Sequence, residues 1–185
     1  MIHASSDKGQ DLPSVCQKLL IRKEDLVSAE QIHADGIALV SAKDKGSQIP
    51  KVDALITAEK SVPLTVRTAD CAPILIHDPV TEVLALVHAG RCGTELEITY
   101  KTVQKLKGAF GSEPKDLKVI VGPCIDKCCY PMDIREKNLE QLARVGVPKE
   151  NIAVDPDCTC CNSDKYYSYR GDGPETGRMF LVARL

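Results

Sequence analysis

RTADCAPILIHDPVTEVLALVHAGRCGT, the stretch from Arg67 to Thr94, decides the fold because it places two apolar runs on either side of a turn. Runs of this length bounded by Pro, Asp and Gly are typical of strands. Cys71 follows the run VPLTVRTAD, and His88 ends the run VLALVH. If the two strands are adjacent and end at one rim, they bring a thiolate and an imidazole together.

His33, in AEQIHADG, precedes another apolar run, IALVSA, and is a third candidate. One Cys and two His suit an open zinc site that keeps a fourth position for water or substrate. The structural alternative is a buried Cys that behaves as a small hydrophobe and core histidines with satisfied hydrogen bonds. Two features favour a site: Cys71 follows the polar Thr-Ala-Asp, and His88 precedes Ala-Gly, where backbone can approach a ligand closely. We interpret His3 and His77 as structural.

A chain of 185 residues suffices for one domain with a sizeable core. The net charge of -2 provides no footprint for nucleic acid or an anionic membrane, and 4% aromatics without Trp provide no base-stacking platform. No stretch approaches the roughly 20 apolar residues of a membrane span. The start, MIHASSDKGQDLPS, does not resemble a signal peptide. Nine cysteines without an export signal indicate reduced thiols, metal or catalysis, so we expect a cytoplasmic protein.

The rest of the chain mixes strand and helix signals. We expect residues 1–11 to be loose and Pro13 to start a short helix. The expected strands are residues 37–42, DALIT, VPLTVRT, PILIH, EVLALVH and DLKVIVG, and the tail holds NIAVD and a final run, MFLVARL. A capping box formed by Thr94 and Glu97 predicts a helix with Leu96, Tyr100, Val103 and Leu106 on one face, closed by Gly108 and Gly111.

Asp133 and Glu136 form a second capping pair, and the helix that they open ends at Gly146 and Pro148. Strands and helices do not alternate as regular βαβ units. We therefore expect an α+β fold, a mixed α/β sandwich in which mixed β-sheets are flanked by helices, with residues 1–185 forming a single domain.

Two cysteine runs and two arginines remain. The runs, CxxxCC and CxCC, would suit a second zinc ion or an iron–sulfur cluster, but they do not form a pair of C-x-x-C knuckles. We favour two neighbouring loops that wall the pocket. Arg170 and Arg178 flank GDGPETG and suit phosphate or another planar anion, although surface arginines are usually just solvated. The cysteines concerned are Cys124, Cys128, Cys129, Cys158, Cys160 and Cys161.

Five motifs in order, QIH, TADCAPILI, VHAG, GPCIDKCCY and YSYRGDGPETGRM, give the chain a specific resemblance. From about Leu26 to the end, it resembles the polyphenol oxidase or laccase-domain family, also called the peptidoglycan-editing-factor or purine nucleoside phosphorylase family. The resemblance implies a monomeric cytoplasmic zinc protein with a mixed α/β sandwich fold. It implies metal ligation by His33, Cys71 and His88.

The activities implied are phosphorolysis of purine nucleosides (adenosine, inosine and methylthioadenosine) and zinc-dependent deamination of adenosine. The older copper-oxidase label is disfavoured, because these three ligands do not supply several His-rich copper centres. The family pattern HAG-Trp-Arg-Gly reads HAGRCG here, so the aromatic residue is missing and the basic residue, Arg91, is displaced by one position. The family's N-terminal section is also shortened, and any substrate contact that it makes is lost or replaced.

Three hypotheses follow. The first is a purine nucleoside phosphorylase or deaminase with zinc at His33, Cys71 and His88, in which Gln31, Arg91 and Arg170 bind substrate. Asp70 is a candidate proton carrier, and an ordinary structural carboxylate is the favoured alternative. The second is a metal-free hydrolase with Cys71 as nucleophile and His88 as base, acting on an amide such as a mis-made peptidoglycan precursor. The third is a catalytically degenerate member that binds a nucleotide or stores metal.

Overall fold

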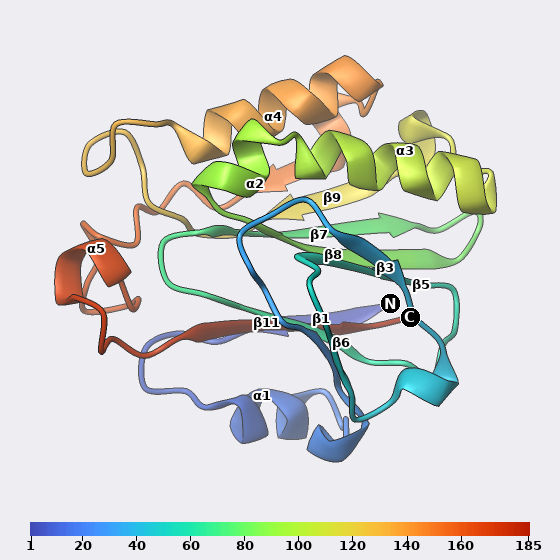
Figure 1. Cartoon of the computed structure of the whole chain (residues 1–185), viewed down its shortest axis with the longest axis horizontal. Helices are drawn as coiled ribbons and strands as arrows, with labels where there is room; N and C mark the ends of the chain where they lie inside the picture. Colours follow the sequence, from blue (N-terminus) through green and yellow to red (C-terminus); the bar gives the residue numbers. More distant parts are fainter.

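The computed structural model describes residues 1–185 and contains two mixed sheets with helices on their outer faces (Figure 1). Four single 3-10 turns lie at Lys23–Asp25, Ala42–Asp44, Pro114–Asp116 and Lys149–Asn151. The helices are α1 (Leu12–Lys18), α2 (Arg91–Glu95), α3 (Ile98–Phe110), α4 (Ile134–Val145) and α5 (Tyr169–Asp172). The strands are β1 (Ile2–Ser5), β2 (Val27–Ala29), β3 (Ile37–Leu39), β4 (Gln48–Ile49), β5 (Ala54–Thr57), β6 (Leu64–Thr68), β7 (Ala72–Asp78), β8 (Val83–Ala89), β9 (Lys118–Val121), β10 (Ile152–Val154) and β11 (Met179–Arg184).

The two sheets are the inner layers of the molecule. One has five strands in the order β1-β11-β6-β2-β4, and the other has six in the order β10-β9-β7-β8-β5-β3. Figure 1 shows α2, α3 and α4 over the six-stranded sheet and α1 beneath the five-stranded sheet. This arrangement confirms the predicted α+β fold with mixed sheets flanked by helices.

Alternation along β7 explains why the strand is buried on both faces. Ile74 and Ile76 belong to the core between the six-stranded sheet and the helices. Leu75 points the other way, into the core shared by the two sheets. Each such fully buried side chain contributes roughly 1.5–3 kcal/mol relative to an exposed one. The continuous apolar run of the quoted stretch therefore belongs to the central strands of the sandwich.

The helix after this stretch does not begin as predicted. Thr94 lies inside α2, and Glu97, with a φ of 62°, separates α2 from α3. The Thr94 hydroxyl accepts a hydrogen bond from the side-chain amide of Asn138 on α4 at 2.9 Å, so it caps nothing. Leu96 is 45% exposed and does not join the apolar face. The predicted capping box was wrong, because Thr94 lies inside α2 and not at a helix start. Gly111 does close α3, whereas Gly108, also predicted to close it, lies inside the helix.

Two other helix starts are confirmed. The Asp133 side chain accepts a hydrogen bond from the backbone N–H of Glu136 at 2.9 Å, and α4 ends at Gly146. In α1, Pro13 lies in the first turn, which Asp11 caps. Both starts depend on contacts within one turn, the kind of contact that a sequence pattern predicts well.

The N-terminal residues are ordered, contrary to the expectation for residues 1–11. Ile2–Ser5 forms β1 and pairs antiparallel with β11, so the two ends of the chain are neighbours (Figure 1). Its pairing partner lies more than 170 positions away, which no local pattern reveals. The strand predicted for residues 37–42 is also shorter, because Ser41 caps the 3-10 turn that follows β3. None of the helices is long and apolar enough to cross a membrane.

Candidate metal centre and pocket

The three predicted ligands converge. His33 lies in the loop between β2 and β3, Cys71 directly precedes β7, and His88 is the penultimate residue of β8. Their ligand atoms all lie within 4.8 Å of one another. The rim differs from the one expected. Cys71 stands before the start of β7, not at the end of a strand, and the antiparallel pairing of Pro73 with His88 brings the two residues together.

Asp53, which the sequence reasoning missed, organises both histidines. It is fully buried and accepts a hydrogen bond from His88 Nδ1 at 2.8 Å. Its two oxygens also accept the backbone N–H groups of Ile32, His33 and Ala34 at 2.9–3.1 Å. A carboxylate that holds Nδ1–H leaves Nε2 of His88 free to bind a metal, the usual support of a metal-binding histidine. The available signal was an Asp immediately before the apolar run ALIT.

The electrostatics of this group suit a cation. Burial alone would raise the pKa of Asp53, but the hydrogen bonds from His88 and the backbone hold it below its usual value. Partial desolvation and the neighbouring His88 ring lower the pKa of His33, which favours the neutral imidazole that binds metals. Burial, and next the charge of Asp70, raise the pKa of the Cys71 thiol to about 12. A bound metal ion would deprotonate that thiol outright.

The backbone around the site is held in unusual conformations. Gln31, His33 and Asp70 have φ values of 61°, 60° and 87°, in the left-handed region. Such residues cost roughly 1–3 kcal/mol each and persist only where the surroundings over-determine them. Gln31, a predicted substrate contact, is thus in a loop and not in a strand. Its amide bonds both the N–H and the carbonyl of Arg67, at 2.9 and 2.7 Å, and so ties the His33 loop to β6.

Asp70 is 8% exposed, and both of its carboxylate oxygens are engaged. One accepts the hydroxyl of Thr159 and the other the backbone N–H of Arg170, each at 2.7 Å. This arrangement is that of a carboxylate which positions the Cys71 loop against the C-terminal part of the chain. Proton transfer by Asp70 stays a prediction.

Gly90 provides a test of whether the donors fit a metal. A Cβ atom on Gly90 would lie 2.9 Å from Cys71 Sγ and 3.0 Å from His33 Cδ2. Real Cβ atoms essentially never approach other atoms below 3.0 Å, so the space between the two ligands is kept open by the missing side chain. Two imidazoles and one thiol are also a donor set that zinc accepts, with a fourth position left for another ligand. The residues therefore fit a zinc ion.

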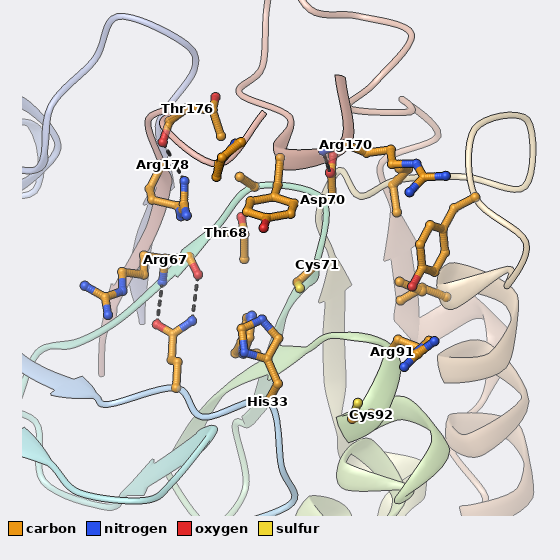
Figure 2. A pocket seen from close by; sticks show the side chains of 18 of the residues that line it. His33, Arg67, Thr68, Asp70, Cys71, Arg91, Cys92, Arg170, Thr176 and Arg178 are labelled. Carbon is orange, nitrogen blue, oxygen red and sulfur yellow. Dashed lines mark hydrogen bonds between the residues drawn. The ribbon is translucent and has the colours of Figure 1, made fainter. Parts of the chain in front are cut away.

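The three ligands line a cavity of about 1100 Å³. Four arginines, Arg67, Arg91, Arg170 and Arg178, share its wall. Figure 2 shows His33 facing Cys71, with Arg67 and Arg178 on one side and Arg91 and Arg170 on the other. Gln31, Asp70 and Cys92 also line the cavity, together with Tyr130 and Tyr169 from the cysteine-rich loop regions. Planar guanidinium groups around an open metal position suit a small anion such as phosphate.

The fold and the site together define an α+β sandwich protein with a candidate His2Cys metal centre in an arginine-lined pocket. The chain belongs to the family described as multi-copper polyphenol oxidoreductase laccase, whose model matches residues 9–135 and 130–185. This match confirms the family resemblance of the motifs.

Similar proteins carry one recurring name. The purine nucleoside phosphorylase YlmD of Geobacillus stearothermophilus is 31% identical over 84% of this chain and 70% of its own length. A purine nucleoside phosphorylase of Clostridium acetobutylicum is also 31% identical, over 85% of this chain and 75% of its own length. The crystal structure of the Geobacillus YlmD superposes with a TM-score of 0.88 at 30% identity, over 95% of this chain and 82% of that one.

Proposed function

We propose that this protein is a zinc-dependent purine nucleoside phosphorylase that acts on adenosine, inosine or methylthioadenosine. The observation that carries the proposal is the convergence of His33, Cys71 and His88 in a pocket whose wall holds four arginines. The names of the similar proteins support the same reaction class. The arginines offer a binding site for the phosphate nucleophile, and the metal donors would place a positive charge beside it.

In phosphorolysis, a phosphate oxygen forms a bond to C1′ of the ribose as the bond from C1′ to the purine nitrogen breaks. Arg91 and Arg170 bind the phosphate and orient it, because their guanidinium groups pair with phosphate oxygens in a fork. Zinc held by His33, Cys71 and His88 would supply a positive charge and a Lewis acid beside the reacting oxygens.

Other residues keep the site in shape. Asp53 holds the tautomer and ring orientation of His88. Gln31 bridges the His33 loop to the backbone of Arg67 on β6 and faces the cavity. Asp70 positions the segment that carries Cys71. These contacts fix the candidate metal ligands and the pocket wall relative to one another, which holds reacting groups in place.

Deamination of adenosine is a second reaction of the same site in this proposal. The nucleophile would then be a water molecule that attacks C6 of the purine in place of C1′ of the ribose, and ammonia would leave as inosine forms. The two reactions differ in one respect that is simple to measure, because only phosphorolysis consumes phosphate.

A metal-free hydrolase is the alternative with a specific observation in its favour. The site has the arrangement of a catalytic triad, with Cys71 as nucleophile, His88 as base, and Asp53 as the carboxylate that orients the base. Its substrate would be an amide such as a mis-made peptidoglycan precursor. Two features disfavour the hydrolase. The pKa of Cys71 is raised to about 12, so the free thiol is not poised to ionise. The His33 ring also lies only 4.8 Å from the His88 ring, and the hydrolase mechanism gives it no role.

The test is product analysis by chromatography after zinc-loaded protein is incubated with adenosine, inosine and methylthioadenosine, with and without phosphate. We expect free purine base and ribose 1-phosphate (methylthioribose 1-phosphate from methylthioadenosine) only when phosphate is present, and inosine from adenosine without phosphate if deamination occurs. His88→Ala should abolish both products. His77→Ala is the matched control, because His77 lies on the neighbouring strand β7, does not line the cavity and should leave turnover unchanged.

Elemental analysis of protein purified without chelator identifies the metal. Zinc supports the proposal, and copper in its place would contradict it. Turnover of an amide by metal-free protein, lost on alkylation of Cys71, would support the hydrolase. Zinc without any turnover across the nucleoside panel would leave a degenerate member that binds a nucleotide or stores metal.

A further inference from the structure

A second group of metal-binding side chains lies in the two cysteine-rich loops. The Sγ atoms of Cys128, Cys129, Cys158 and Cys161 all lie within 4.8 Å of one another. Cys161 Sγ is 3.3 Å from Cys128 Sγ and 3.4 Å from Cys129 Sγ. None of the four is in a disulfide. The loops join β9 to α4 and β10 to α5, so the cluster assembles from two segments about 30 residues apart.

These separations suit a tetrahedral ion. Zinc binds thiolates at about 2.3 Å, and a regular tetrahedron of that radius places its sulfurs about 3.8 Å apart. The observed separations, from 3.3 Å to at most 4.8 Å, bracket that value. An iron–sulfur cluster would occupy the middle of the group and hold its four cysteine sulfurs farther apart. A single ion therefore fits the space that four sulfurs leave here.

Hydrogen bonds within and between the loops organise the second loop. Cys124 and Cys158 form an isolated parallel bridge that joins the loops. The backbone N–H and the side-chain amide of Asn162 both bond the Cys158 carbonyl, at 3.0 and 2.9 Å. The N–H of Asp126 points at Cys158 Sγ at 3.3 Å, a hydrogen bond that stabilises a sulfur carrying negative charge.

Arg135 clamps the two loops from the side. Its guanidinium forms an ion pair with Asp126 of the first loop and bonds the Asp157 carbonyl of the second. Arg135 is 9% exposed, and its Nε has no hydrogen-bond partner. A zinc ion with four thiolates carries a net charge of -2, so a largely buried cation beside the loops offsets part of that charge.

We propose that Cys128, Cys129, Cys158 and Cys161 bind a second zinc ion in a closed structural site. Cys158 and Cys161 have C-x-x-C spacing, whereas Cys128 and Cys129 are adjacent, so the sequence lacks the second knuckle and the site was not favoured from the pattern alone. Four protein ligands leave no open position, so the ion has no catalytic role. Binding to four thiols releases up to four protons.

The role of this site is to brace one wall of the pocket. Thr159, inside the second loop, donates its hydroxyl to Asp70, and the N–H of Ile125, at the start of the first loop, bonds the Asp70 carbonyl at 2.8 Å. Asp70 directly precedes the pocket ligand Cys71. Ile125 and Tyr130 also line the cavity. Fixing the two loops to each other therefore fixes the surface against which substrate packs.

Metal content tests the inference. Protein purified under reducing conditions without chelator should contain two zinc ions per chain, as measured by inductively coupled plasma mass spectrometry. His88→Ala should contain one. The double variant Cys128→Ser, Cys161→Ser should also contain one, and Cys160→Ser is the matched control that keeps two, because its sulfur lies outside the four-sulfur group. Cobalt-loaded His88→Ala protein, whose loops are unaltered, should show the intense absorption of a tetrahedral thiolate cobalt site.

Three results would overturn the proposal. One is His88→Ala protein without zinc and without the thiolate cobalt spectrum. Another is a protein mass lower than expected by two hydrogen atoms, which would show a disulfide between these loops under reducing conditions. Iron with inorganic sulfide is the third. If the pocket binds no metal, the wild-type protein and His88→Ala would each hold one zinc ion, so failure of the proposed function is distinguishable from failure of this inference.

Discussion

Replacing Asp53 with Asn should lower both the zinc affinity of the site and the stability of the metal-free protein, and the two effects can be measured separately. Asp53 Oδ1 accepts hydrogen bonds from His88 Nδ1 and the N–H of His33, and Oδ2 accepts the N–H groups of Ile32 and Ala34. An Asn side chain offers one acceptor and one donor. If its oxygen takes the place of Oδ2, its NH2 group faces the N–H of His33 and donates to His88 Nδ1. His88 would then carry its proton on Nε2, the atom needed for the metal.

The opposite orientation is no better, because the NH2 group would face the N–H groups of Ile32 and Ala34. Each buried donor that loses its acceptor costs about 1–3 kcal/mol, so one or two such losses predict a destabilisation of about 1–6 kcal/mol. For a chain of this size, 1 kcal/mol shifts Tm by about 2–4 °C. Loss of a residue that orients a ligand typically weakens metal affinity about 10- to 100-fold.

Zinc affinity of Asp53→Asn is measured by competition with a chromophoric chelator, and Tm is measured on metal-free protein. The control is Asp35→Asn in the same loop, where a part-exposed carboxylate pairs with Lys101 at the surface. That change should cost less than about 1 kcal/mol and leave zinc affinity alone. Zinc affinity of Asp53→Asn within twofold of the wild type would refute the assigned role of Asp53.

Three further predictions follow from single side chains. Gly90→Ala places a methyl group 2.9 Å from Cys71 Sγ, so the zinc affinity measured by chelator competition should fall at least about tenfold. The control is Gly108→Ala in α3, where open space surrounds the added methyl group. This variant should raise the free energy of unfolding in urea by up to about 1 kcal/mol. Arg170→Ala removes a guanidinium but keeps the backbone bond to Asp70, so KM for phosphate should rise about tenfold in initial-rate assays with Tm unchanged. Burial would raise the pKa of Asp78, but its hydrogen bonds hold that pKa below the usual 3.8. The Asp78 carboxylate therefore stabilises the fold above pH 3.8 and loses this effect as the pH falls through the lowered pKa. In urea unfolding, the Asp78→Asn variant should accordingly lose less stability than the wild type below about pH 4.

Local patterns predicted the elements whose signals lie within a few residues. Asp133 caps α4 and Gly146 ends it, because both contacts close within one turn. The Thr94 capping box has the same pattern and fails, because Asn138, 44 positions away, supplies a competing partner for the hydroxyl. β1 was missed for a related reason. It is only four residues long and mostly exposed, and pairing with β11 is what makes it a strand.

The site divides in the same way. The candidate ligands His33, Cys71 and His88 could be found in the sequence because only a small set of residue types binds metals and these three lie next to apolar runs. Asp53 was not, because a lone Asp before a strand is common, and its role depends on the pairing of β5 with β8 that places His88 beside it. The sulfur cluster was not predicted because adjacent cysteines are not a zinc knuckle, and the two runs meet only in the folded chain, through contacts such as the bridge between Cys124 and Cys158.

The position of the pocket follows from one short connection between the two sheets. β6 ends at Thr68 in the five-stranded sheet, and β7 begins at Ala72 in the six-stranded sheet. Four steps of an extended chain reach at most about 14 Å, and packed sheets stand about 10 Å apart. The connection is therefore short for the gap that it crosses, and it bends at residues 69–71. Cys71 is held at the mouth of the sandwich by this short connection and by Asp70. The two carboxylate oxygens of Asp70 accept hydrogen bonds from Thr159 in the second cysteine-rich loop and from the backbone N–H of Arg170. Residues 69–71 thus carry the crossing between the sheets, one of the three candidate metal ligands, and the contact of Asp70 with the second cysteine-rich loop.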